Sequence, residues 1–386
     1  MNADELWLSD LKVLDLSRLL PGPFCTLMLA DMGADVLKIE STTGGDYARY
    51  YPPMAGEYGA FFAGINRNKR SMTLNLKEET GVYVLQKLVE EADILVESFR
   101  PGVMDRLCLG YETLSDINEG LIYCSISGYG QIGPMKGKAG HDLNYMARAG
   151  LLEQNGRHGE SPVVPGFQLA DIAGGALYAA VGILAALHKR ERTGKGAHVD
   201  ISMTDGALSF HLPMHSSLAA GQPQERGRGM LTGGLPCYNV YETKDGKYLS
   251  VGSLEPKFWM GFVQVIDAPE VAGEGMNAGE QGEETRAQVA EVLRQKTLEE
   301  WLSLFEEADV CVEPVRSPAE VLEDELFKAR EMFFDIAGVH QTRTPLTPKD
   351  REHTAAPGLG EHTEEVLEGL GYGAEEVGAM KDEGVI

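Results

Sequence analysis

The first 200 residues alternate between short apolar runs and segments with helical spacing of their apolar positions. The ranges 11–17, 34–40, 93–98 and 121–127 are apolar runs that predict strands. The segments between them repeat apolar residues every three or four positions, which is typical of helices packed by one face. Strands that alternate with helices indicate a parallel sheet covered by helices. We therefore predict an α/β fold with a Rossmann-like large domain.

The pattern changes after residue 220. A longer apolar helix over 171–191 and a further strand over 194–203 close the first region, and a glycine-rich connector follows at 226–234. The segment 238–253 then predicts a β-hairpin whose turn is Asp245-Gly246. Charged helical segments follow. We predict a large domain over 1–220 that is completed by 330–386, and a smaller α+β domain over 225–325.

Composition bounds the class of protein. The chain has 386 residues and 43% hydrophobic content, enough for a large core and, at roughly 150 residues per domain, for two domains. No stretch approaches the ~18 uninterrupted apolar residues of a membrane span, and the first ten residues are acidic where a signal peptide is basic. These features predict a cytoplasmic protein that does not associate with membranes.

Charge and cysteine usage exclude two further classes. The 59 acidic and 34 basic residues give a formal net charge of −25, which argues against a nucleic-acid partner. A local basic patch remains compatible with an anionic ligand. The five cysteines are widely spaced and have no histidine at metal-ligand spacing, so we expect reduced thiols and no metal site.

Two glycine-rich segments resemble phosphate-binding motifs. Residues 128–133 match G-x-G-x-x-G after a predicted strand, but Pro134 follows at once, where a dinucleotide site needs the start of a helix. Residues 193–196 lack the first glycine of a P-loop and the hydroxyl residue after its lysine. Neither segment supports nucleotide binding.

Three polar residues lie in contexts suited to chemistry. His141 lies at a loop-to-helix junction, although a lone histidine is more often structural. Asp171 begins the apolar helix; the simplest interpretation is an N-cap, and the functional one is an ionised carboxylate in a pocket that Gly174 and Gly175 leave open to a backbone or a substrate. Glu255 follows the hairpin, either on a surface loop or partly desolvated and bound to a histidine.

Together these segments resemble family III of the CoA-transferases, also called the CaiB/BaiF family, over nearly the whole chain. The matching stretches include LKVLDLSRLLPGPFCTLMLADMGADVLKIE, ADILVESFRPGVMDRLCLGYE, QLADIAGGALYAAVGILAAL and RTGKGAHVDISMTDG. The resemblance implies an interlocked homodimer whose active site lies between the large domain of one subunit and the small domain of the other. It also implies no tightly bound cofactor, with coenzyme A entering as part of the substrate.

Two motifs resemble the α-methylacyl-CoA racemase branch of that family. They are Gly140-His-Asp-Leu-Asn-Tyr145 and Glu255-Pro-Lys-Phe258. The resemblance implies that His141, Asp171 and Glu255 are catalytic. In the transferases of the family, an aspartate at the position of Asp171 is instead a nucleophile that forms an aspartyl-CoA intermediate, so CoA transfer between carboxylic acids remains the alternative.

Epimerisation at an α-carbon explains why two extra groups are needed. One group takes the proton from one face of a planar enolate and another returns a proton to the opposite face. We hypothesise that His141, polarised by Glu255, serves one face and Asp171 the other. The backbone N–H groups of Asp171 and Ile172 are candidates for stabilising the enolate oxygen.

The resemblance places coenzyme A in the N-terminal domain, where basic groups suit its phosphates. One departure concerns Ser41-Thr42-Thr43, because many relatives carry an arginine after the preceding strand; that contact is either missing or supplied by Lys38. Methionine-containing segments, such as 202–206, either line an acyl site or pack in the core. The predicted CoA contacts are Arg18, Leu19, Leu20, Lys69, Arg70, Ser98, Phe99, Arg100, Arg106 and Lys138.

Overall fold

The computed structural model describes residues 6–386, which form two compact units. The large unit contains the chain up to Ala149, together with Phe167–Phe210 and Glu325–Ile386. The small unit contains Gly150–Gly166 and His211–Asp324. Each unit has its own apolar core, so each is described by itself.

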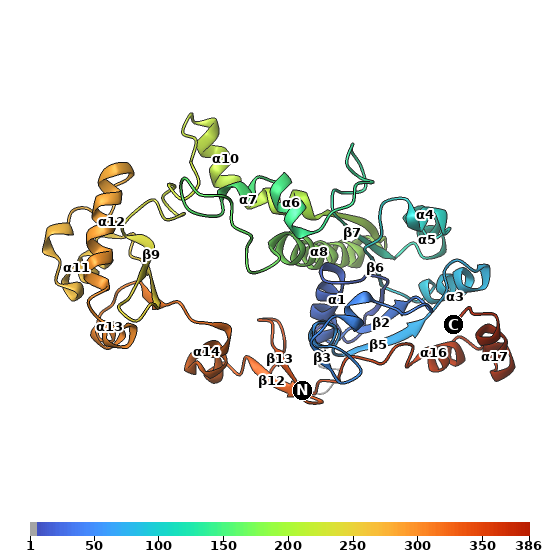
Figure 1. The fold of residues 1–386 in the computed structure, drawn as a ribbon. Coiled ribbons are helices and arrows are strands. Elements are labelled where there is room, and N and C mark those ends of the chain that lie inside the picture. Colours follow the sequence, from blue (N-terminus) through green and yellow to red (C-terminus); the bar gives the residue numbers. More distant parts are fainter. Residues whose placement is uncertain (1–5) are drawn as a thin grey trace. The chain divides into compact units, whose positions relative to one another are not determined.

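A six-stranded parallel sheet forms the centre of the large unit, in the order β5-β2-β1-β6-β7-β8 (Figure 1). This confirms the predicted α/β class. The edge strand β5 was not among the predicted strands, because its sequence KRSMT is not an apolar run. The strands are β1 (Lys12–Asp15), β2 (Asp35–Glu40), β5 (Lys69–Thr73), β6 (Ile94–Glu97), β7 (Ile122–Ser127) and β8 (Ala197–Ser202).

Helices cover this sheet because each buries an apolar face. In α3 (Glu79–Val89), Val84, Leu85 and Val89 are fully buried against the sheet core, as the helical spacing predicts. The glycine-rich segment 128–140 forms a loop without a helix, in agreement with the rejection of a dinucleotide site. The other helices near the site are α1 (Pro21–Asp31), α4 (Val103–Arg106), α6 (Asp142–Arg148), the π-helix η3 (Ala170–Leu177), α8 (Tyr178–Thr193) and α9 (Met203–Ser209).

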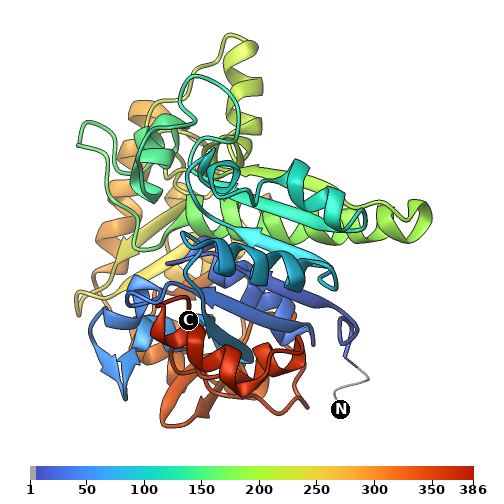
Figure 2. The ribbon, with the colours of Figure 1, turned by 90° about the vertical axis from the view of Figure 1, so that its right-hand side faces the viewer.

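The C-terminal segment returns to the large unit and packs beside β5. Figure 1 shows the red helix α16 (Thr363–Gly369) next to this strand, and α17 (Ala374–Asp382) packs on α16; both red helices are also seen in Figure 2. The backbone of His362 donates to the carbonyl of Ser71 at 2.9 Å, and that of Asn75 to the carbonyl of Val385 at 2.7 Å. Leu367 and Val385 are buried in the core. The end of the chain therefore completes the sheet's packing.

The small unit is built on an antiparallel sheet in the order β11-β10-β9. The predicted hairpin is confirmed: β9 (Tyr238–Glu242) and β10 (Tyr248–Gly252) pair across a turn in which Gly246 has φ +73°. Trp301 and Phe262 are fully buried at its centre. The remaining main elements are β11 (Val312–Pro314), α7 (Leu151–Gln154), α10 (Leu212–Ala219), α11 (Pro256–Ile266), α12 (Gly279–Leu293), α13 (Leu298–Phe305) and α14 (Pro318–Glu323).

Two segments from the predicted large domain lie in the small unit, namely 150–166 and 211–220. The first of these segments is joined to the glycine-rich connector by polar contacts. The Arg226 guanidinium donates to the carbonyl of Glu153 at 3.0 Å and pairs with its carboxylate at 3.2 Å. These contacts link residues more than 70 positions apart. Local sequence composition therefore could not predict this part of the domain boundary.

The apolar helix formed by η3 and α8 is longer than the sequence indicated. Ala170–Thr193 is long and apolar enough, by length and composition, to cross a membrane, which corrects the expectation that no stretch approaches that limit. In this fold, however, it packs against α1, α9 and the strands β7 and β8. Its opposite side leaves Leu177, Val181 and Leu184 exposed.

Candidate active site

His141 and Asp171 both lie in the large unit, at the beginnings of two helices that pack together, α6 and η3. His141 is the N-cap of α6, with extended backbone angles of φ −131° and ψ 174°. Its backbone N–H donates to Oδ1 of Asn144 at 3.0 Å. The side chain of His141 is exposed, so the imidazole is accessible to a substrate.

Asp171 lies within the first turn of η3 and does not cap it. The N-cap position belongs to Leu169, which corrects the interpretation of Asp171 as a helix cap. The backbone N–H of Asp171 donates to Oδ1 of Asp142 at 3.0 Å. A π-helix is rare and is often found at functional sites, and here it carries a half-buried carboxyl group.

Burial and a neighbouring charge keep a proton on Asp171. Burial, followed by the negative charge of Asp142, raises the pKa of Asp171 to about 7. This differs from the expectation that a carboxylate at the start of this helix is kept ionised. A carboxyl group with a pKa close to 7 is suited to both accepting and returning a proton near neutral pH.

Gly174 and Gly175 allow neighbouring helices to approach η3. A Cβ at Gly174 would lie 2.9 Å from the carbonyl oxygen of Met203 in α9, and one at Gly175 would lie 3.2 Å from Cβ of Pro21 in α1. Of the two roles considered, close approach of a backbone is the one that the structure shows.

Tyr145 is a residue of the site that sequence reasoning missed. Its buried hydroxyl donates to the carbonyl of Gly140, directly before His141. A Cβ at Gly128 or Gly140 would lie 2.5 or 2.6 Å from the tyrosine ring. The Tyr145 ring packed against these glycines explains why they have no side chain. The signal in the sequence for the role of Tyr145 was the pair of glycines that precede α6.

The proposed enolate-stabilising N–H groups are already occupied. The N–H of Asp171 is bound to Asp142, and that of Ile172 donates to the carbonyl of Gln168 at 3.0 Å. The assignment of these two groups to the enolate oxygen is therefore wrong in this structure.

Glu255 belongs to the small unit, whereas His141 and Asp171 belong to the large unit. It occupies the N-cap position of α11, and Pro256 is the first residue of that helix. Its side chain is exposed, so within the described chain it is not the desolvated carboxylate considered above. Its catalytic role stays a prediction.

Three predicted CoA contacts meet at the turn between β1 and α1. The backbone N–H of Arg18 donates to Oγ of Ser98 at 3.1 Å. The Arg18 guanidinium lies 5.0 Å from the centre of the Phe99 ring and 5.4 Å from that of Tyr47. Basic, hydroxyl and aromatic groups thus lie together at the carboxyl ends of β1 and β6, the edge where parallel sheets bind ligands.

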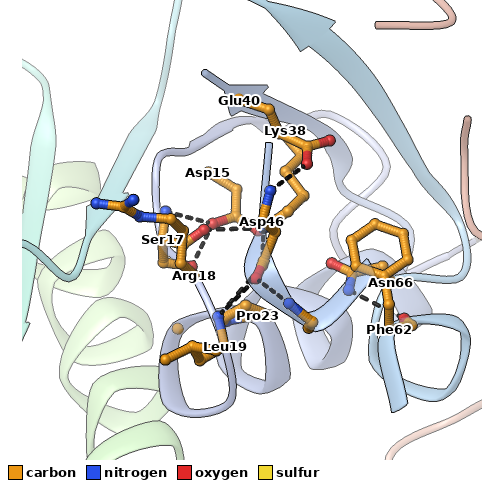
Figure 3. Close-up of polar contacts among 12 residues, drawn as sticks. Asp15, Ser17, Arg18, Leu19, Pro23, Lys38, Glu40, Asp46, Phe62 and Asn66 are labelled. Carbon is orange, nitrogen blue, oxygen red and sulfur yellow. Dashed lines mark hydrogen bonds and ion pairs between the residues drawn. The ribbon is translucent and has the colours of Figure 1, made fainter. Parts of the chain in front are cut away.

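The backbone of this turn is held by hydrogen bonds to a buried carboxylate. Leu19 adopts a left-handed conformation with φ +64°, which is unfavourable for a residue with a side chain. Its N–H donates to both carboxylate oxygens of Asp46, at 3.1 and 3.2 Å (Figure 3). Asp46 therefore fixes the turn that presents Arg18.

Lys38 does not replace the arginine that many relatives carry after β2. It is fully buried; its Nζ donates to the carbonyl of Ser17 at 2.8 Å and pairs with Asp46 at 3.1 Å (Figure 3). The corresponding segment instead has Ser41 hydrogen bonded to Thr43. The suggestion that Lys38 contacts CoA is therefore incorrect, and its role is to neutralise Asp46.

Lys69 and Arg70 are also engaged within the protein. The buried Nζ of Lys69 donates to Asp15, Thr26 and Asn66 at 2.8–3.1 Å, which leaves no path to a phosphate. Arg70 binds the carboxylate of Asp35 through two hydrogen bonds at 2.6 and 3.0 Å. By contrast, the side chains of Arg100, Arg106 and Lys138 are exposed and available to a ligand.

Metal chemistry has no evident centre in the described chain. Over residues 6–386, no group of three His, Cys, Asp or Glu side chains is arranged to hold a metal ion. The site is therefore described by its carboxyl, imidazole and basic groups.

Comparison with known proteins identifies the family. Residues 8–363 match CoA-transferase family III. The chain is 38% identical to human α-methylacyl-CoA racemase, over 98% of this chain and 97% of that protein. It is 32% identical to human succinyl-CoA:glutarate CoA-transferase, over 98% and 90%. A CAIB/BAIF family protein from Brucella suis superposes with a TM-score of 0.82 at 32% identity, over 95% of this chain and 99% of that one.

The chain therefore belongs to CoA-transferase family III, and it is an enzyme that acts on acyl-CoA thioesters. Its sheet and its small antiparallel sheets match the solved CaiB/BaiF fold. Relatives of both kinds, racemase and transferase, align along almost its full length.

Proposed function

We propose that this enzyme is an α-methylacyl-CoA racemase, which interconverts the (2R) and (2S) forms of a 2-methylacyl-CoA. The observation that carries the proposal is the pair of helix starts in the large unit, with the accessible imidazole of His141 on α6 and the half-buried carboxyl of Asp171 on η3. Two proton-transfer groups of different type match a 1,1-proton transfer.

The proposed reaction passes through an enolate. In one direction the His141 imidazole removes the α-proton, the thioester carbonyl takes up the negative charge, and the Asp171 carboxylic acid delivers its proton to the opposite face of the α-carbon. In the other direction the roles are reversed. A pKa of about 7 leaves Asp171 both protonated and ionised in useful amounts near neutral pH. Glu255 is proposed to polarise His141.

CoA transfer between carboxylic acids is the alternative, supported by the transferases among the relatives. In that reaction Asp171 attacks the thioester carbonyl as a carboxylate. The burial that raises the pKa of Asp171 reduces the ionised fraction, which favours proton transfer over nucleophilic attack.

The acyl-CoA substrate is proposed to lie with its phosphates near Arg18, Ser98 and Phe99. The contacts of Arg18 with Ser98 and Phe99 support this placement. Arg100, Arg106 and Lys138 supply further exposed positive charge, which suits the diphosphate of CoA despite the net charge of −25.

We further propose that the enzyme acts as an interlocked homodimer in the cytoplasm. Leu177, Val181 and Leu184 lie on one side of the helix Ala170–Thr193 and are exposed, an arrangement that suits burial against a second copy. Sedimentation equilibrium should give twice the chain mass. Val181→Glu should shift the equilibrium to monomer, whereas Tyr83→Glu, at an exposed aromatic residue of α3, should not.

The activity is tested by incubating the enzyme with (2R)-2-methylacyl-CoA in D₂O. We expect deuterium at the α-carbon together with formation of a mixture of the (2R) and (2S) forms. Mass spectrometry measures the deuterium, and chiral separation measures the ratio of the two forms. A parallel reaction contains a free carboxylic acid. New acyl-CoA made from that acid, without α-exchange, would overturn the racemase proposal in favour of the transferase.

A further inference from the structure

Asp142 is next to His141 in the sequence and is hydrogen bonded to the backbone of Asp171, but it has no part in the proposed proton transfer itself. It is the first residue of α6, directly after His141, and only 9% of its surface is exposed. Its Oδ1 accepts the backbone N–H of Asp171 at 3.0 Å. The backbone of Ala170 also favours the ionised form of this carboxyl group. One carboxylate therefore joins the first turn of α6 to the first turn of η3.

The surroundings of this carboxylate contain no compensating cation. The backbone groups of Asp171 and Ala170 favour its ionised form, and no lysine or arginine of the described chain contributes. The buried carboxylates of β1, β2 and the 46–50 segment, in contrast, each have a basic partner. Asp142 thus leaves its negative charge facing Asp171.

We propose that Asp142 is a positioning residue for the proton transfer, whose carboxylate fixes the start of η3, and hence Asp171, against the start of α6, and hence His141. The inference rests on the proposed racemase function. A neutral side chain of the same shape would keep much of the position but remove the charge, and a small apolar one would remove both. The two effects are therefore separable by substitution.

The charge has a second consequence for Asp171. Burial is the larger cause of its raised pKa, and Asp142 is the one ionisable group that adds to it. Tyr145 of α6 is the titratable neighbour whose own pKa Asp171 raises. Within the described residues, no ionisable side chain of α1, α8, α9, β7 or β8, the other elements packed on η3, contributes to the shift.

The test compares Asp142→Asn with Asp142→Ala in the full-length enzyme. For Asp142→Asn we expect the pH profile of α-proton exchange to shift to lower pH by roughly one unit, because the like charge is lost. For Asp142→Ala we expect the same shift with a further loss of kcat of roughly 10–100-fold, because the helix starts are no longer joined. KM should change by less than about twofold in both.

Asp205→Asn is the matched control. Asp205 lies in the first turn of α9, the element with the most extensive packing on η3, but its side chain is exposed and does not act on Asp171. Its pH profile should coincide with that of the unmodified enzyme. An unshifted profile in Asp142→Asn, or an equal shift in Asp205→Asn, contradicts the proposal.

A measurement without substrate separates this inference from the proposed function. The Asp171 carboxyl is identified by ¹³C NMR as the signal lost in Asp171→Asn, and its titration is followed in the other variants. We expect a midpoint near 7 in the unmodified enzyme and a lower one in Asp142→Asn. A midpoint that does not move overturns the inference. A shifted midpoint in a protein without α-exchange overturns the function alone.

Discussion

Two groups of carboxylates in the large unit, among those removed from solvent, differ in how their charges are compensated. In the first, which we call the ion cluster (Asp15, Lys38, Glu40, Asp46, Arg49 and Lys69), every carboxylate has a basic partner. Lys69 pairs with Asp15 at 3.1 Å and Lys38 pairs with Asp46 at 3.1 Å. In the second, the Asp142 carboxylate binds the backbone N–H of Asp171, and neither carboxyl group has a basic partner among residues 6–386.

The difference is visible in the protonation of the two groups. Burial opposes ionisation in both, but Lys38 and Lys69 outweigh it and hold the pKa of Asp15 well below its usual range. At Asp171 burial and the neighbouring charge act in the same direction. Compensated carboxylates support the backbone, as Asp46 supports Leu19, whereas the uncompensated pair is prepared to exchange a proton.

Removing the Asp171 carboxyl group from the uncompensated pair should have the largest effect on catalysis. We expect Asp171→Asn to lower α-proton exchange by about 10²–10⁴-fold, because one of two proton-transfer groups is lost. The thermal midpoint should not fall, since the variant also removes an unfavourable pair of charges. Exchange above about one tenth of the original rate would contradict the assigned role.

Breaking a compensated pair should have the opposite profile, with its main effect on stability. We expect Lys38→Met to lower the free energy of unfolding by about 3–5 kcal/mol, because Asp46 is left buried and unpaired. Denaturant unfolding measures this. Lys12→Met is the control: its pair with Glu91 is exposed and screened by solvent, so the change in unfolding free energy should be much smaller than for Lys38→Met.

The pH dependence of stability provides a smaller and more specific effect. The pKa of Asp171 is raised to about 7 in the folded protein, from an ordinary value of 3.8, so the folded state binds more protons between these values. Stability from this group is therefore full below about pH 4 and is lost as the pH rises towards 7. Urea midpoints of Asp171→Asn should decline less over this window than those of the unmodified enzyme.

The smallest expected effect concerns the turn above the ion cluster. Leu19→Gly relieves a left-handed conformation, whereas Leu20→Gly removes the same side chain from a residue with φ −113°. Leu19→Gly should therefore be the more stable variant by roughly 1 kcal/mol. Equal unfolding free energies would show that the turn is not strained at Leu19.

Much of the fold could be predicted from the sequence because it depends on local pattern. The central strands of the sheet are continuous apolar runs, as expected for strands buried on both faces, and the turn Asp245-Gly246 specifies its hairpin. The edge strand β5 lacked this signal. It is polar because its two basic residues pair with Asp15 and Asp35, which come together only in the folded sheet.

The candidate site was predictable in its residues but not in its electrostatics. His141 was singled out from its motif and Asp171 from its place at the start of the apolar helix, yet the hydrogen bond between Asp142 and Asp171 joins positions 29 residues apart. The family resemblance placed both Lys69 and Arg70 at CoA, although neighbours on a strand point to opposite faces. The roles of Lys69 and Arg70 therefore depend on how far each side chain is buried, and burial could not be predicted from the sequence alone.

The return of the last residues to the sheet has a consequence for biosynthesis. Val385 lies in the core of the large unit, and its carbonyl accepts the backbone N–H of Asn75, two residues after the end of β5. During translation residues 363–385 follow the whole of the small unit, so the small unit can be synthesised in full while the large unit still lacks part of its core. We expect the large unit to complete its core only after these residues have been synthesised, and therefore later than the small unit.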